Sequence, residues 1–354
     1  MTMWKNTLYK EDLETCLSSV INLDKLRDKS LLITGATGMI GSFIVDAIMH
    51  GNYTRNLNCT IIAMGRNVAK ARSRFVNHWS NSSFQFVQHD VNQPLDEHVP
   101  AVNYIIHSAS TTHPVAYASE PIGTITTNIF GTYNLLNFIC SHSLNTRLLL
   151  MSSVEIYGQN RGDVEFFDES YCGYIDCNTL RAGYPESKRL SESLCQAYVK
   201  EKGVDYVSAR IPRTYGPTMQ MSDTKALSQF IKKGLAGEDI VLKSRGDQFF
   251  SYAYVADAAS AILSIMLAGT TGAAYNIADA ESDITLRELA QLVADSSATK
   301  LCFELPDAVE AAGFSAATKA VQIATALKTL GWRPHYRIAD GVARTLAILR
   351  ANDA

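Results

Sequence analysis

The sequence predicts an α/β fold in which a doubly wound parallel sheet carries a smaller C-terminal α/β lobe. Short apolar runs typical of buried strands alternate with helical stretches as far as about residue 212. This alternation is the pattern of a parallel sheet covered by helices on both faces. Beyond it, Pro212, Gly216 and Pro217 interrupt the chain. The chain has 354 residues, more than the roughly 250–300 at which a single core stops growing, so a second lobe is expected.

The first expected element is an amphipathic helix over residues 8–29, followed by a strand that ends at Thr34. Later strands are expected at residues 60–64, 84–89, 104–107, 148–152 and 206–210, with helices between them at about 66–79, 119–142 and 184–202. A helix is then expected from about 223 to 236, and a strand with a helix near 252–268. The uncharged stretch 258–278 contains glycines and suits a buried helix with a turn better than a membrane span.

The composition excludes several classes of function. The chain has 32 Lys plus Arg against 35 Asp plus Glu, a net charge of −3, so neither nucleic acid nor an anionic membrane is an expected partner. Its 7 cysteines are scattered without a Cys-x-x-Cys pair, which argues against a disulfide framework and against a metal site. The charged first twelve residues show no signal peptide. We therefore expect a soluble, cytoplasmic protein.

A glycine-rich turn follows the first strand and opens a helix. Gly35 permits a tight turn, Gly38 lets the backbone approach a pyrophosphate, and Gly41 allows close packing of helix on strand. The helix N-terminus adds N–H donors and a positive dipole. The turn is thus predicted to bind a dinucleotide through Gly35, Thr37, Gly38, Met39, Ile40 and Gly41. A tight turn with only a structural role is the alternative.

This turn sets the expected division of the chain. Residues 30–212, with a return of about 250–278, are predicted to form a Rossmann-type dinucleotide-binding domain. Residues 1–29 form an N-terminal helical extension. Residues 213–249 and 279–354 form the substrate-binding lobe over the carboxyl ends of the strands, where open α/β sheets bind ligands.

The segment after the second strand is basic. No Asp or Glu lies between Asp46 and Asp90, although dinucleotide folds that prefer NAD place an acidic residue there. Arg66 directly follows the strand end and could hold the 2′-phosphate of NADP. A solvated basic helix face is the alternative, and it is the preferred interpretation for Lys70, Arg72 and Arg74. Asp90, followed by Val91, could accept the adenine amino group or could simply form a turn.

Two segments have the residues of an acid–base site. Tyr184 and Lys188 lie at i and i+4 on one face of a helix. A lysine ammonium beside a tyrosine favours the phenolate, so we expect it to bring the phenol into the range of a general base. Ser152 and Ser153 follow the fifth strand, where a hydroxyl can orient a substrate alcohol. The alternative is an ordinary amphipathic helix beside an ordinary strand end.

With these motifs the sequence resembles the extended short-chain dehydrogenase/reductase family of nucleotide-sugar epimerases, dehydratases and decarboxylases, from about residue 30 to 344. The resemblance rests on Thr-Gly-x-x-Gly-x-x-Gly, Tyr-x-x-x-Lys and Ser-Ser-x-x-x-Tyr-Gly. It implies that Ser153, Tyr184 and Lys188 are the catalytic triad. It also implies cofactor contacts from Ser108, Ala109, Ser110, Asn128, Ser152, Tyr184 and Lys188.

Within the family, the segment Ser153-Val154-Glu155-Ile156-Tyr157-Gly158 resembles the UDP-glucuronate decarboxylases. Glu155 is retained and is expected to act as an acid/base near the sugar, whereas Val154 removes the Asp that the 4,6-dehydratases have. Two departures concern the substrate phosphates: Arg213 replaces the usual Asn, and Phe249 to Val255 lack the usual Arg. The substrate contacts expected from this chain are Thr112, Arg181, Arg213, Lys225 and Arg245.

The expected function is hydride transfer at a sugar hydroxyl, normally that of C4, with Tyr184 as the base. Decarboxylation or epimerisation of a nucleotide sugar would follow. The alternatives are an NADPH-dependent reductase, a 4,6-dehydratase and a non-enzymatic dinucleotide-binding regulator. Arg66 favours NADP, while the resemblance favours NAD. The resemblance also implies a homodimer through the helices at 119–142 and from Tyr184, which carry Ile125, Phe130, Leu135, Leu136, Leu190, Leu194 and Tyr198.

Overall fold

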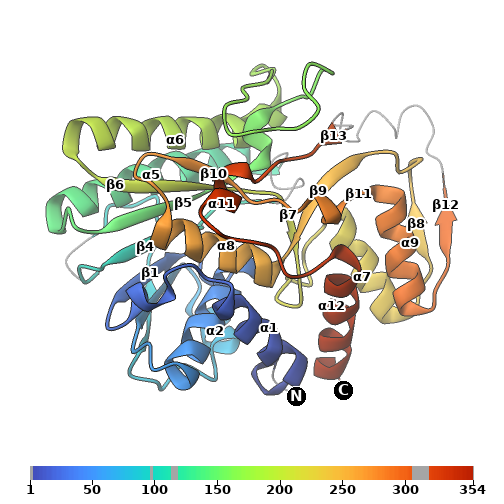
Figure 1. Ribbon diagram of the computed structural model, residues 1–354, viewed down its shortest axis with the longest axis horizontal. Coiled ribbons are helices and arrows are strands. Elements are labelled where there is room, and N and C mark those ends of the chain that lie inside the picture. Colours follow the sequence, from blue (N-terminus) through green and yellow to red (C-terminus); the bar gives the residue numbers. More distant parts are fainter. Residues whose placement is uncertain (1–2, 96–98, 113–118, 305–318, 354) are drawn as a thin grey trace.

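The computed structural model describes residues 3–95, 99–112, 119–304 and 319–353 (Figure 1). Its main layer is a 7-stranded sheet in the order β10-β6-β5-β4-β1-β2-β3. All neighbouring strands in it run parallel. The strands are β1 (Ser30–Thr34), β2 (Thr60–Gly65), β3 (Phe84–Gln88), β4 (Tyr104–His107), β5 (Arg147–Ser153), β6 (Asp205–Ile211) and β10 (Ala274–Asn276). The predicted doubly wound parallel sheet is confirmed.

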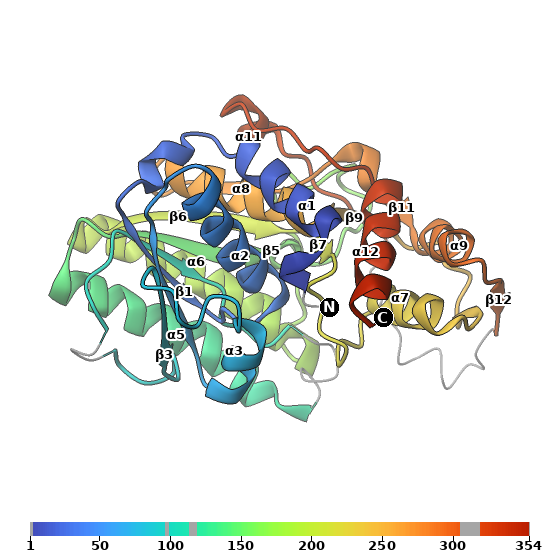
Figure 2. The same ribbon diagram turned by 90° about the horizontal axis from the view of Figure 1, so that it is seen from below.

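Helices cover both faces of this sheet. On one face lie α5 (Pro121–His142) and α6 (Gly183–Lys202); on the other lie α1 (Thr7–Ser18), α2 (Met39–Thr54) and α8 (Val255–Ala268) (Figures 1 and 2). α3 (Val68–Arg74) is shorter than the helix expected at 66–79, because Asn67 caps its start and the chain leaves the helix at Phe75. With both faces covered, the central strands are almost fully buried, as their continuous apolar runs predict.

The smaller lobe is built on two further sheets. One contains β7 (Arg213–Tyr215), β9 (Phe249–Tyr254), β11 (Asp283–Thr285) and β13 (Lys319–Ala320); the other pairs β8 (Ile240–Leu242) with β12 (Leu301–Phe303). Its helices are α7 (Ala226–Ala236), α9 (Leu286–Ser297), α11 (Thr325–Thr329) and α12 (Ile338–Asp353). The strand expected to return to the first domain, β9, instead belongs to this lobe. Only α8 and β10 return to the main sheet.

Short 3₁₀ turns complete the described elements: η1 (Met3–Lys5), η2 (Leu23–Leu26), η3 (Val154–Tyr157), η4 (Leu180–Ala182) and η5 (Ala280–Ser282). The single N-terminal helix expected over 8–29 is wrong, because α1 ends at Ser18 and Asn22 adopts a left-handed conformation with φ 59° before η2. A residue in that conformation cannot continue a right-handed helix.

The N-terminal helix α1 touches both lobes. It packs against α2, α8 and α12. The Tyr9 hydroxyl donates to Asp46 Oδ2 at 2.6 Å. The fully buried Asp12 accepts from the Tyr254 hydroxyl at 2.5 Å and from Arg344 Nε at 2.6 Å. Since a buried carboxylate is costly without such partners, these contacts bind the extension firmly to both lobes.

The uncharged stretch 258–278 forms the end of α8, a turn and β10. Within the described ranges, no helix is both long and apolar enough to cross a membrane. In the same parts of the chain, no group of three His, Cys, Asp or Glu side chains is arranged to hold a metal ion.

Candidate active site

The glycine-rich turn joins β1 to α2 next to the end of β4. Gly35 has φ +64°, and a Cβ there would lie 2.8 Å from the Ala109 backbone. A Cβ on Gly41 would lie 3.0 Å from the Gly35 carbonyl oxygen. Gly38 is the N-cap of α2 and offers no capping side chain. The first N–H groups of α2 are therefore left for a ligand, and a helix N-terminus of this kind suits a phosphate.

Thr34 and His107 lock the turn to β4. Thr34 Oγ1 accepts from the backbone N–H groups of Ser108 at 3.2 Å and Ala109 at 3.1 Å. Its own hydroxyl hydrogen is thus left for His107 Nδ1, 2.8 Å away, which assigns the ring proton to Nε2. Burial, with the nearby charge of Lys188, lowers the pKa of His107 to about 3. A neutral imidazole therefore lies between the turn and Lys188.

Ser153 and Tyr184 come together at the carboxyl end of β5. The Ser153 hydroxyl accepts from the Glu155 N–H at 3.2 Å and begins η3. Tyr184, in the first turn of α6, is 6% exposed. Burial raises the pKa of Tyr184 to about 12; a hydrogen bond with Ser153 lowers it, and the Glu155 charge raises it. In this structure Tyr184 is a phenol at neutral pH.

Lys188 does not lower the pKa of that phenol as the sequence predicted. Its Nζ donates to the Met151 carbonyl at 2.8 Å and lies 5.9 Å from the centroid of the Tyr184 ring. Burial lowers the pKa of Lys188 itself to about 8. For both side chains, removal from water is the largest cause of the pKa shift, and the ammonium of Lys188 is directed at a carbonyl.

Predicted cofactor residues carry buried polar atoms that have no partner. Among the described residues, Ser110 Oγ, Asn128 Oδ1 and Ser152 Oγ are buried without a hydrogen-bond partner, although the Asn128 amide donates to Ser187 Oγ at 2.9 Å. An unmet buried acceptor or donor costs roughly 1–3 kcal/mol. These unpaired atoms, just after β4, on α5 and near the end of β5, fit a polar ligand such as a dinucleotide.

Asp90, Val91 and Arg66, the residues predicted to lie near the adenine, make different kinds of contact. Asp90 Oδ1 accepts from the backbone N–H and the amide of Asn92, both at 3.0 Å, which is the turn-forming arrangement. Val91 is buried, and its carbonyl accepts from Asn134. Arg66 follows β2 with its side chain exposed. Its carbonyl accepts from Gln88 Nε2 at 3.1 Å, which fixes the backbone at this point.

The solvated basic helix face predicted for α3 is wrong for Arg74. Its guanidinium pairs with the buried Asp46 at 2.6 Å, because this end of α3 packs against α2. Lys70 Nζ donates to Gln220 Oε1 at 3.0 Å, and the Gln220 amide reaches the Thr37 carbonyl at 3.4 Å. Gln220 therefore links α3 to the glycine-rich turn, a contact that no local pattern predicts. Lys70 and Arg72 are exposed, as predicted for this helix face, and Arg72 stacks 5.0 Å from the centroid of the Trp79 ring.

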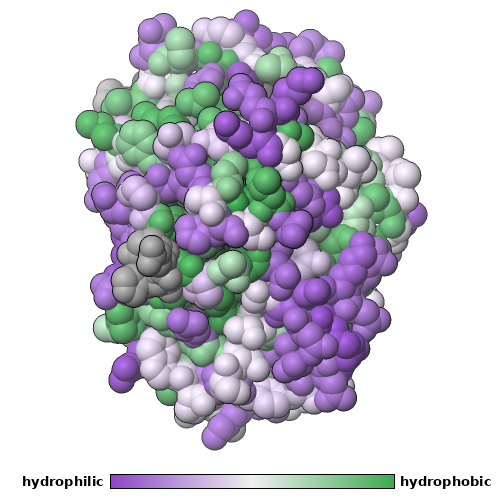
Figure 3. Space-filling model, turned by 90° about the vertical axis from the view of Figure 1, so that its left-hand side faces the viewer, coloured by the Kyte–Doolittle hydropathy of each residue, from purple (hydrophilic) through white to green (hydrophobic). Residues whose placement is uncertain are grey.

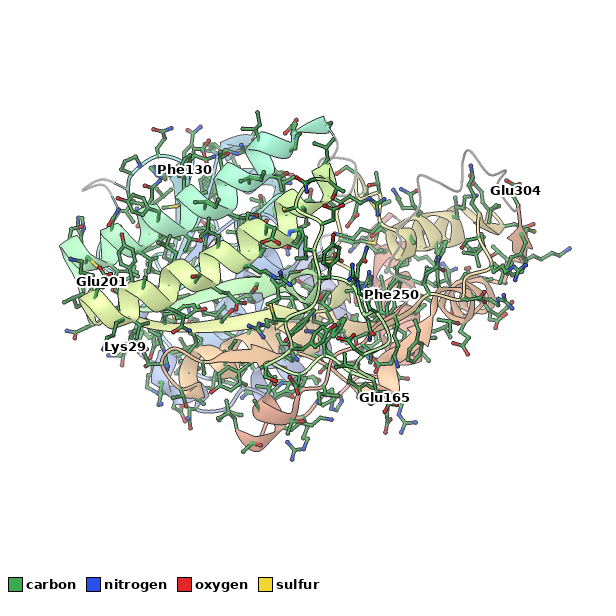
Figure 4. The ribbon with its side chains drawn as sticks, turned by 90° about the horizontal axis from the view of Figure 1, so that it is seen from above. Lys29, Phe130, Glu165, Glu201, Phe250 and Glu304 are labelled. Atoms are coloured by element: carbon green, nitrogen blue, oxygen red, sulfur yellow. The ribbon has the colours of Figure 1, made fainter. Side chains whose placement is uncertain are left out.

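On the substrate side, the structure brings Arg213 to Glu155. Arg213 Nη2 lies 3.8 Å from Glu155 Oε1, and the Glu155 side chain is 51% exposed. Phe250 completes this group at the junction of the two lobes (Figure 4).

The other predicted substrate contacts are more dispersed. Thr112 is half-buried at the end of a described range, and Arg181 is exposed in η4. Lys225 Nζ pairs with Asp223 at 3.3 Å. The Arg245 carbonyl accepts from Arg287, which fixes that loop at the surface. Lys225 and the Arg245 loop thus have partners within the smaller lobe.

The sequence matches the NAD dependent epimerase/dehydratase family over residues 31–278. The chain belongs to this family. It is 32% identical over 320 residues to UDP-glucuronic acid decarboxylase 1 of Danio rerio, covering 90% of this chain and 72% of that protein. It is 30% identical over 317 residues to UDP-glucuronic acid decarboxylase 3 of Arabidopsis thaliana, covering 88% and 86%.

Solved structures of similar fold agree with this family membership. A dTDP-glucose 4,6-dehydratase from Bacillus anthracis in complex with NAD matches with a TM-score of 0.77 and 21% identity, covering 92% of this chain and 97% of that chain. A UDP-glucuronic acid 4-epimerase from Bacillus cereus, in complex with UDP-glucuronic acid and NAD, matches with a TM-score of 0.76 and 19% identity, covering 91% and 99%. At these identities the likeness shows the fold alone.

Proposed function

We propose that this family member oxidises a sugar hydroxyl of a nucleotide sugar, and that its net reaction is decarboxylation of a sugar acid or, failing that, epimerisation. The observation that carries the proposal is the buried Tyr184 bonded to Ser153 at the strand ends that face the glycine-rich turn. The likeness to UDP-glucuronic acid decarboxylases at about 30% identity supports the choice of substrate class.

The described residues fit a nicotinamide dinucleotide, which supplies the hydride acceptor. Gly35, Gly38 and the α2 N-terminus would hold the pyrophosphate, and the orphaned atoms of Asn128 and Ser152 would meet polar groups of the cofactor. Arg66, exposed after β2 with no acidic residue in its segment, supports NADP(H) binding at least as tight as NAD(H) binding.

Tyr184 is the proton acceptor in the proposed mechanism. Because burial favours the phenol form of Tyr184, its phenolate has to form before the chemical step. Ser153 orients the sugar hydroxyl, and the Tyr184 phenolate takes its proton as the carbon loses hydride and becomes a ketone. In a uronate, the carboxylate is then β to that ketone. The bond to the carboxyl carbon breaks, its electron pair passes into an enolate, and CO₂ leaves. Glu155, two residues from Ser153 and half-exposed, donates to the enolate carbon a proton that it takes from solvent. The ketone then takes the hydride back, and Tyr184 returns the proton to its oxygen, so oxidation and reduction cancel within one turnover.

Dehydration is less well supported than decarboxylation. Val154, at the position expected to hold the Asp of 4,6-dehydratases, is buried and apolar. A net reductase remains the second candidate, favoured by Arg66 because NADPH is the usual free reductant. The two classes differ in the fate of the cofactor: it is recycled within one turnover in a decarboxylase or epimerase, and consumed in a reductase.

We also propose a homodimer through α5 and α6. Ile122, Phe130, Tyr133 and Leu190 are large apolar side chains exposed on these two helices, and Phe130 points outward from α5 (Figure 4). Leu135 and Leu136, predicted for the same contact, are fully buried in the core instead. Figure 3 shows one end of the molecule, where apolar and polar residues are interspersed. Light scattering that gives a monomer at micromolar concentration would refute this pairing.

A nucleotide-sugar panel tests the proposed reaction. The purified protein is incubated with UDP-, CDP-, GDP- and dTDP-sugars, including their uronates, with and without added NAD or NADPH, and product masses are measured. We expect loss of CO₂ from a uronate without net consumption of cofactor. Loss of water, an unchanged mass with altered stereochemistry, or gain of two hydrogens would instead assign a dehydratase, an epimerase or a reductase.

A further inference from the structure

Arg213 lies where the chain passes from the main sheet into the substrate lobe. β6 ends at Ile211, whose partner across the sheet is Ser153. β7 begins at Arg213 and pairs with β9, with Arg213 opposite Tyr252. The arginine is therefore anchored just beyond the strand position that faces the Ser153 hydroxyl. Its side chain belongs to the catalytic end of the sheet and not to the outer part of the lobe.

The guanidinium is oriented but incompletely bonded. Its Cζ lies 3.5 Å from the centroid of the Phe250 ring, a stacked arrangement. Nη2 makes a loose ion pair with Glu155 at 3.8 Å, and Nη1 is buried without a hydrogen-bond partner among the described residues. Stacking uses only the face of the guanidinium, so its in-plane N–H donors remain available to an anion. Phe250 thus orients a guanidinium in which one terminal nitrogen is loosely paired and the other has no partner among the described residues.

The neighbouring groups narrow the kind of anion that fits. Glu155 already places a carboxylate beside Arg213, and the Glu155 charge also acts on Tyr184. Glu155 and one ligand carboxylate place two negative charges against one guanidinium, whereas Glu155 and a diphosphate would place about three, so a single carboxylate is the better matched anion. Because Glu155 adjoins both Arg213 and the reacting centre, the anion belongs to the sugar ring itself.

We propose that Arg213, backed by Phe250, is a specificity-determining residue that binds a carboxylate carried by the sugar ring of the substrate. This inference rests on the proposed function and deepens it, since it separates uronates from neutral hexoses within the class of nucleotide sugars. Arg213 would hold the carboxylate by a forked, charge-assisted pair of hydrogen bonds. The diphosphate is then left to other side chains of the lobe.

Paired ligands that differ only in the carboxylate test this inference. Calorimetry of the cofactor-loaded protein compares UDP-glucuronate with UDP-glucose, and GDP-mannuronate with GDP-mannose. For the pair that binds the parent protein, we expect Arg213→Ala to weaken binding of the uronate about ten- to hundred-fold, as for the loss of a charge-assisted contact. Binding of the hexose should change by less than about twofold. Arg213→Lys, which keeps the charge but not the fork, should give an intermediate loss for the uronate.

Arg337→Ala is the matched control. Arg337 is another arginine of the substrate lobe paired with a glutamate, at 2.8 Å from Glu281, and it is 71% exposed. Arg337→Ala should change the affinity for neither the uronate nor the hexose. Equal weakening of uronate and hexose by Arg213→Ala, or no weakening of either, would overturn the inference while leaving the proposed function in place. A parent protein that binds none of the four ligands would overturn the proposed function and the inference together. If Arg213→Ala does not fold, the ratio of the dissociation constants of Arg213→Lys for uronate and hexose is compared with that of the parent, and it decides in the same way.

Discussion

The glycine-rich turn and the junction between β6, β7 and β9 both bind ligands in the proposed function, yet they are built differently. The turn consists of consecutive residues whose backbone geometry excludes side chains, as the 2.8 Å approach to Ala109 shows at Gly35. The junction consists of Glu155, Arg213 and Phe250, from three separate strand ends. The turn depends on residues that are adjacent in the chain, so it can be predicted from the sequence. The junction depends on which strand ends meet, and its unmet donor is visible only in three dimensions.

The largest expected effect is the loss of turnover when Tyr184 loses its hydroxyl. Tyr184→Phe should lower kcat by roughly 10²–10⁴-fold, the usual contribution of a positioned acid–base group. The phenol oxygen is the proton acceptor, whereas the ring only packs at the start of α6. Cofactor binding and the unfolding midpoint should stay close to those of the parent. Turnover within about threefold of the parent would remove Tyr184 from the mechanism.

The next effect measures how strictly the turn requires glycine. Gly35→Ala places a Cβ 2.8 Å from the Ala109 backbone at φ +64°, while Gly237→Ala has nearly the same φ, +71°, with nothing within 4 Å. The control should cost about 1–2 kcal/mol of unfolding free energy from backbone strain alone. Gly35→Ala should cost clearly more and should also weaken cofactor binding. Equal urea denaturation midpoints for the two variants would show that the turn tolerates a side chain.

Replacing Arg66 tests the cofactor preference, for which the local charge favours NADP(H) and the family resemblance favours NAD(H). Arg66→Ala should weaken NADP(H) binding about ten- to hundred-fold, as expected for losing a charge-assisted contact, and leave NAD(H) binding unchanged. Arg72→Ala is the control, since Arg72 stacks on Trp79 in the same segment. Calorimetry in which the parent clearly prefers NAD, and Arg66→Ala affects both cofactors equally, would reduce Arg66 to a neighbour of the adenine.

The smallest effect concerns Lys188 and depends on pH. Burial lowers the pKa of Lys188 from 10.5 to about 8, so the unfolded chain binds more protons than the folded one between these values. The contribution of Lys188 to the free energy of unfolding therefore becomes more favourable as pH rises from 8 toward 10.5. Below pH 8 the folded protein bears the whole cost of burying the charged ammonium. Lys188→Met should be no less stable than the parent at pH 7, and its stability relative to the parent should fall by pH 9.5.

Thermal midpoints at pH 7 and pH 9.5 check this prediction. Lys200→Met, which removes an exposed lysine from the same helix, is the control. If Lys188→Met is strongly destabilised at pH 7, the bond from Lys188 Nζ to the Met151 carbonyl outweighs the cost of burying the ammonium.

The sequence alone was enough for the sheet, the glycine-rich turn and the family. Continuous apolar runs specify buried parallel strands, and the spacing of Gly35, Gly38 and Gly41 specifies a turn that opens a helix, because both depend on residues adjacent in the chain. Helix ends were harder to predict. α1 stops at Ser18 because Asn22 turns left-handed, although the apolar pattern continues beyond it.

Only the tertiary structure decided which side chains meet. It assigned β9 to the smaller lobe, paired Arg74 with the buried Asp46, and joined Lys70 to the glycine-rich turn through Gln220. It also raised the pKa of Tyr184 where the Tyr-x-x-x-Lys spacing predicted a lower one. The physical reason is common to all four. Burial, desolvation and ion pairing depend on contacts between segments far apart in the chain, and residue spacing within one segment carries no record of those contacts.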